Sequence, residues 1–85
     1  MHFTIIVSTP VKRFQMQVKR VYQSEQVERY EISAGCKTIT VRNNRPFVKN
    51  NRKKPDWKLE EGEVSDKQSF AMTLFEIEKY LDVND

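Results

Sequence analysis

The feature that most constrains the fold is a change in hydrophobic periodicity along the chain. In the first half, apolar side chains recur at every second position, as in Phe3–Val7 and Phe14–Val18. Between residues 70 and 81 they recur instead at i, i+4, i+7 and i+11. A period of two places alternate side chains on opposite faces of a strand, whereas the second spacing places them on one face of a helix. The sequence therefore predicts several strands followed by one helix.

Breaks in the alternation place the turns. After Val18 two polar residues, Lys19 and Arg20, fill a gap where one belongs, which predicts a β-bulge. Gly35 suits a turn because glycine takes positive φ without steric cost. Asn43-Asn44 suits a two-residue type I′ hairpin turn, since asparagine tolerates the left-handed region. The expected strands lie at about residues 3–8, 14–21, 29–32, 38–42 and 45–49, with a short extended piece at 56–59.

The helix has a recognisable start. Ser65 is expected to be the N-cap, and Gln68 three residues later completes a capping box. Asp66 stands favourably at the positive end of the helix dipole. The helix is expected to run from about residue 66 to about residue 82.

These elements predict a single domain, 1–85, of the α+β class: an antiparallel sheet of about five strands with one C-terminal helix packed across one face. Its 38% hydrophobic residues are enough for one modest core. The side chains expected to form it are Phe3, Ile5, Val7, Phe14, Met16, Val18, Tyr30, Ile32, Ile39, Val41, Val48, Phe70, Leu74, Ile77 and Leu81.

The formal net charge of +3 hides an uneven distribution. Residues 1–58 hold 13 Lys and Arg against 4 Asp and Glu, whereas residues 59–85 hold 2 against 8. Such asymmetry can mark a surface that binds polyanions. The alternative is that the acidic segment folds back and neutralises the basic one.

The expected hairpin around Asn43-Asn44 places the cations. With those two residues as the turn, positions whose numbers sum to 87 face each other, so Ile39 faces Val48 and Val41 faces Pro46 on the core side. Proline at that position confines the returning strand to a sheet edge. The opposite face would carry Thr38, Thr40, Arg42, Arg45, Phe47 and Lys49, and we expect it to be open to water.

A basic sheet face with an aromatic suits single-stranded DNA or RNA. Cations neutralise phosphates and an aromatic ring stacks on a base. The sequence therefore predicts a non-enzymatic binding module, with the cationic loop extending the phosphate track. Its candidate binding residues are Arg42, Arg45, Phe47, Lys49, Arg52, Lys53 and Lys54. The alternative is that Phe47 packs under the C-terminal segment and the cations merely protect a sheet edge from association.

A second function class comes from the helix. Met72 and Phe75 lie away from its main apolar stripe, beside Lys79. A partner chain could bury them, and a homodimer or protein-interaction module using the helix and the sheet edge is the alternative function. Wider burial within the chain would also account for them. Trp57 is expected to pack at the core or its rim, with base stacking as the alternative.

Several chemistries lack the residues they need. One histidine, His2, and one cysteine, Cys36, cannot make a zinc site or an intrachain disulfide. With two glycines there is no Gly-rich phosphate loop. A ribonuclease built from Tyr30, Arg42 and Arg45 has no support beyond composition. We therefore expect no enzyme activity and no cofactor. The apolar run near the N-terminus is too short for a signal peptide or membrane span, so a cytoplasmic protein without membrane association is expected.

Two resemblances extend these expectations. The pattern Asn44-Arg45-Pro46, then Lys54-Pro55-Asp56-Trp57-Lys58 and Gly62, resembles one in short uncharacterised bacterial proteins of similar length, which implies a complete protein but no function. The order of strands followed by one helix is similar to the Pur-alpha repeat, a single-stranded nucleic-acid binder. That likeness is of topology only. The chain begins with an additional strand and shows no motif of that family, so no binding residue is transferred.

Overall fold

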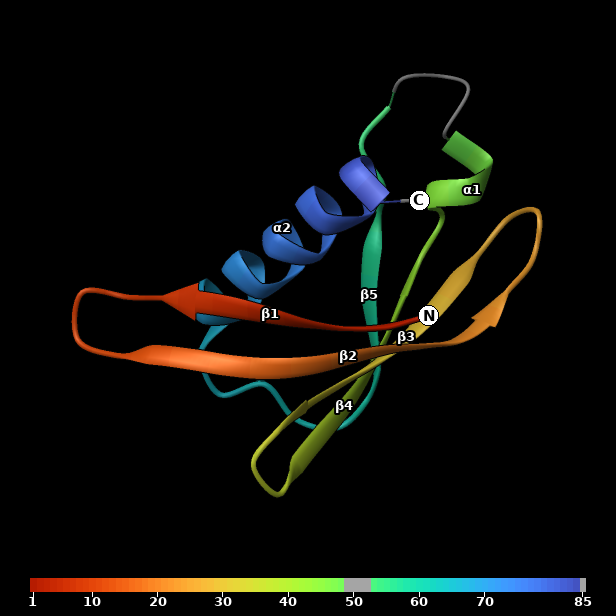
Figure 1. Cartoon of the computed structure of the whole chain (residues 1–85). Helices are drawn as coiled ribbons and strands as arrows, with labels where there is room; N and C mark the ends of the chain where they lie inside the picture. The colour runs from red at the N-terminus through yellow and green to blue at the C-terminus, as the bar shows by residue number, and fades with distance from the viewer. Residues whose placement is uncertain (49–52, 85) are drawn as a thin grey trace.

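The computed structural model describes residues 1–48 and 53–84. Five strands form one antiparallel sheet in the order β1-β2-β3-β4-β5, and α2 lies across one face of it, nearest to β1 (Figure 1). This confirms the predicted α+β class. The elements in chain order are β1 His2–Ser8, β2 Arg13–Gln23, β3 Glu28–Ala34, β4 Lys37–Asn43, α1 Arg45–Val48, β5 Trp57–Glu61 and α2 Lys67–Asn84.

The core forms between α2 and the face of the sheet that it covers, called here the core face. Ten of the fifteen predicted core residues are buried, and the other five are partly buried: Phe14, Met16, Ile39, Phe70 and Leu74. From the helix, Ile77 and Leu81 are fully buried, and the Tyr80 ring stacks on Phe3 of β1 at 3.9 Å between centroids. Alternation and helical spacing therefore found the core correctly.

The predicted bulge in β2 is confirmed. The register passes from Arg20 opposite Tyr30 directly to Tyr22 opposite Arg29, so Val21 is the extra residue. Arg20 therefore faces the core side beside buried Tyr30, and Val21 is exposed. Arg20 can occupy this inward position because its guanidinium forms an ion pair with the buried carboxylate of Glu28.

The predicted hairpin at Asn43-Asn44 is wrong. Residues 45–48 form the short helix α1, and β4 pairs instead with β5, placing Val41 opposite Leu59 and Asn43 opposite Trp57. The Asn44 carbonyl accepts hydrogen bonds from the amides of Phe47 and Val48, as at a helix start. Asparagine suits a helix N-terminus as well as a hairpin turn, and proline is tolerated in the first turn of a helix.

Two asparagine side chains fix this start. Asn43 Oδ1 accepts from the Arg45 amide at 2.8 Å, and Asn44 Oδ1 accepts from the Asp56 amide at 2.7 Å. The second bond connects the start of α1 to the segment before β5. Val48 is buried as expected, although in a helix and not a strand.

Helix α2 also begins one residue later than predicted. Asp66, not Ser65, is the N-cap: its Oδ1 accepts from the Gln68 and Ser69 amides, and its Oδ2 accepts from the Ser69 hydroxyl at 2.8 Å. These bonds, that of the Ser69 hydroxyl foremost, lower the pKa of Asp66. Gly62, between β5 and α2, has φ +94° and packs against Ile39 of β4, which leaves no space for a side chain there.

Candidate functional site

The predicted binding residues do not share one face. Arg42 lies on the outer face of the sheet, which is the face opposite α2, whereas Arg45 is only 8% exposed. Phe47 is 59% exposed on α1, and Lys53 and Lys54 are exposed before β5. Lys49 and Arg52 lie outside the described residues. The expectation that Arg45 faces water is therefore wrong.

Arg45 belongs to a buried ionic cluster. Its Nη1 lies 3.1 Å from Glu28 Oε2, and Arg20 Nη1 lies 2.9 Å from the same oxygen. Arg45 Nη2 also donates to the carbonyl of Leu81 at 3.4 Å. One carboxylate with no exposed surface thus joins β2, β3 and α1, and Arg45 extends the connection to α2. Burial of the Tyr30 side chain, followed by the nearby Glu28 charge, raises the pKa of Tyr30.

The outer face carries a different set of cations. Cα partners in the register run from Tyr22 on β2 to Arg29 on β3, then to Arg42 on β4 and Lys58 on β5. Directly paired residues point to the same face, so these four side chains form one row across four strands, called here the outer row. With strands about 4.8 Å apart, the row spans roughly 14 Å. None of the described elements covers this face (Figure 1).

Contacts within the outer row hold its members in place. The Arg29 guanidinium carbon lies 5.1 Å from the centroid of the Tyr22 ring, a cation–π contact, and Tyr22 is 46% exposed. Glu60, the extra residue of a bulge in β5, places its carboxylate 2.8 Å from Arg29 Nε and 4.0 Å from Arg42 Nη1. The acidic segment therefore partly neutralises the row, as the alternative interpretation of the charge pattern expected.

Sequence reasoning missed Tyr22, Arg29 and Lys58. Alternation with buried Tyr30 already assigns Arg29 to the outer face, so that signal was present. The placement of Tyr22 depends on which residue the bulge inserts, and that of Lys58 depends on the pairing of β4 with β5. Neither placement can be predicted from the neighbouring residues in the sequence alone.

The remaining predicted residues have clear positions. Trp57 donates from Nε1 to Glu78 Oε1 at 2.6 Å and lies 6.1 Å from the Tyr30 ring, which confirms its packing role. Met72 packs partly against the core, whereas Phe75 is 60% exposed beneath the Lys79 ammonium. Cys36 is exposed in the turn between β3 and β4.

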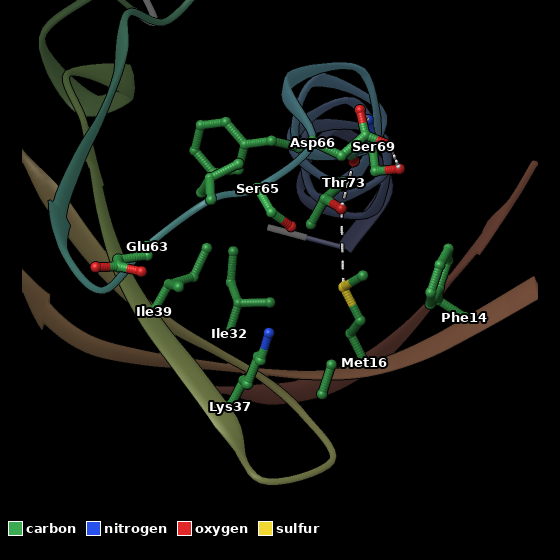
Figure 2. A pocket seen from close by; sticks show the side chains of 13 residues that line it. Phe14, Met16, Ile32, Lys37, Ile39, Glu63, Ser65, Asp66, Ser69 and Thr73 are labelled. Carbon is green, nitrogen blue, oxygen red and sulfur yellow. Dashed lines mark hydrogen bonds between the residues drawn. The ribbon is translucent and has the colours of Figure 1, made fainter.

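A pocket of about 270 Å³ opens on the core face, where the first turns of α2 meet β2, β3 and β4 (Figure 2). Its floor is formed by Met16, Ile32 and Ile39, and its rim includes Lys37 and Glu63. Four predicted core residues, Phe14, Met16, Ile39 and Phe70, are only partly buried because they line this space.

No known protein family, no curated protein and no solved structure matches this chain. The two resemblances of the sequence therefore stay predictions. Within residues 1–48 and 53–84, no group of three His, Cys, Asp or Glu side chains is placed to hold a metal ion, and neither helix is long and apolar enough to cross a bilayer.

Proposed function

We propose that the outer face of the sheet binds single-stranded nucleic acid, with the outer row as its main contact. The observation that carries the proposal is the row itself, which puts three cations on adjacent strands beside an exposed aromatic ring. Glu60 offsets part of the repulsion between Arg29 and Arg42, but like charges directly opposite each other destabilise a sheet, so folding alone gives no reason for Lys58 to stand beside Arg42. An anionic partner that spans the row would give one.

The members of the row have separate roles in this proposal. Arg29, Arg42 and Lys58 neutralise phosphates and release counterions, and Tyr22 offers a ring for stacking on a base. Lys53 and Lys54 precede β5 at the end of the sheet where the row lies, and they extend the cationic surface. Arg42, Lys53 and Lys54 are retained from the sequence prediction, while Arg45 is replaced because it is held by Glu28.

The proposal is tested by the salt dependence of binding to random single-stranded 12-mers of DNA and RNA, followed by fluorescence anisotropy. Arg29→Ala, Arg42→Ala and Lys58→Ala should each weaken binding and reduce the slope of log K against log salt by about 0.7. Tyr22→Ala should weaken binding by roughly 1–3 kcal/mol with little change in slope, because stacking releases no counterion.

Lys67→Ala is the matched control, since it removes one exposed positive charge from α2, on the other side of the sheet. It should change the affinity far less than the variants of the row. If the wild type binds neither DNA nor RNA at low salt, or if Lys67→Ala weakens binding as much as Arg29→Ala, the outer row is not a nucleic-acid site.

A further inference from the structure

The pocket on the core face has the size and lining of a small-ligand site. Its volume of about 270 Å³ is close to the lower end of the range for such sites, roughly 300–1,000 Å³. Apolar side chains come from three strands and from α2, and they include Phe14 and Phe70. The Thr73 hydroxyl is already engaged, because it donates to the Ser69 carbonyl at 2.8 Å and approaches the Met16 sulfur at 3.7 Å.

One cation points into this apolar space. Lys37 stands two residues before Ile39 on β4 and is paired with Ala34, so the pleat directs it to the core face. Figure 2 shows the Lys37 side chain beside Ile32 with its amine turned toward the pocket, while Glu63 lies at the margin. Among residues 1–48 and 53–84, no carboxylate oxygen lies within 4 Å of the Lys37 amine.

Two carboxylates, Glu63 and Asp66, also line the pocket, Glu63 at its margin and Asp66 beside the start of α2. The Asp66 carboxylate caps α2 through the Gln68 and Ser69 amides and the Ser69 hydroxyl. It is therefore committed to the helix and does not compete for Lys37. Apolar walls together with one unpaired ammonium complement a ligand that has an apolar chain and a single negative charge.

We propose that this pocket binds a small amphipathic carboxylate, with its chain between Ile32, Ile39 and Phe70 and its head group at Lys37. The inference does not rest on the outer row, because the two sites lie on opposite faces of the sheet. Burial of each methylene is worth about 0.8 kcal/mol, so affinity should rise about fourfold per added methylene until the pocket is full and then level off.

The test uses decanoate, and decanol as its uncharged counterpart, titrated by calorimetry and by amide chemical shifts in NMR. At the efficiency usual for small ligands, decanoate should bind with a Kd of roughly 0.1–1 mM. Lys37→Gln should weaken decanoate roughly three- to fivefold and leave decanol unchanged, because Lys37 is exposed and its charge is screened. The matched control is Lys19→Gln on the outer face, which should leave the affinity for both ligands unchanged.

A second variant tests the cavity itself. Ala34→Leu places a larger side chain in the lining and should abolish the binding of both ligands. If that variant does not fold, the amide chemical-shift changes of the wild type test the proposal by themselves. They should be largest at Ile32, Ile39 and Thr73. Decanoate that fails to saturate the wild type, shifts centred elsewhere, or equal losses in Lys37→Gln and Lys19→Gln would overturn the proposal.

Discussion

At the scale of single residues, Glu28 has the most consequential position in the chain. It was not among the predicted core residues, yet it has no exposed surface and its Oε2 contacts both Arg20 and Arg45. Removing one partner of a buried ion pair leaves the other charges uncompensated and costs far more than the net value of the pair. Arg45, a candidate phosphate ligand by sequence, is by structure a part of this cluster.

Glu28→Gln should therefore destabilise the protein by roughly 3–5 kcal/mol, because the Arg20 and Arg45 guanidinium groups both lose the charge of the Glu28 carboxylate. The free energy of unfolding, measured by urea denaturation, checks this. Glu25→Gln is the matched control: Glu25 is exposed, and its loss should change stability by less than about 0.5 kcal/mol. Equal midpoints for the two variants would show that the cluster does not stabilise the fold.

At the scale of elements, the sequence and the structure assign the N-cap of α2 to different residues. A capping box points to Ser65, whereas the hydrogen bonds assign the cap to Asp66. The two interpretations differ by one residue, which is within the range where local signals compete. They make opposite predictions for single substitutions.

Asp66→Ala should lower the melting temperature, and Ser65→Ala should leave it nearly unchanged. The Asp66 effect should also depend on pH. Because the pKa of the folded state lies below the ordinary value of 3.8, the stabilising contribution is present above that value and is lost as the pH falls through the lowered pKa. Melting curves at neutral pH and at pH values below about 4 provide the measurement; a gap between the wild type and Asp66→Ala that stays constant over this range would contradict the assignment.

At the scale of the whole molecule, the exposed side of α2 is the surface through which two copies would associate. Helix α2 buries one stripe against the sheet and leaves Phe75 mostly exposed, with Lys79 over its ring. Met72 turns partly toward the core instead. The homodimer predicted from these two side chains thus depends chiefly on Phe75.

If α2 forms that interface, Phe75→Asp should yield monomers in sedimentation equilibrium while the circular dichroism spectrum stays native. The introduced carboxylate would need to be desolvated at the interface, which is costly without a partner charge. Glu76→Gln serves as a neighbouring control on the same helix. A wild type that is monomeric at millimolar concentration would end the dimer hypothesis and would leave the nucleic-acid proposal unaffected.

Local pattern was enough to determine β1 to β4, α2, the class and most of the core of this protein. Apolar residues with a period of two or of 3.6 mark the side chains that a strand or a helix buries. Burial of apolar side chains is the dominant favourable contribution to folding. For the same reason Arg42 was assigned correctly to a face away from the core.

Tertiary structure alone decided which segment pairs with β4, and with it the composition of the outer row. Asn43-Asn44 is compatible with a hairpin turn or with a helix start, and the choice lies in contacts distant in sequence: Glu28 and Leu81 with Arg45, and Asp56 with Asn44. Long-range pairing is stabilised only when the whole fold is present. Lys58, which joins Arg42 across β4 and β5, therefore could not be placed by any local signal.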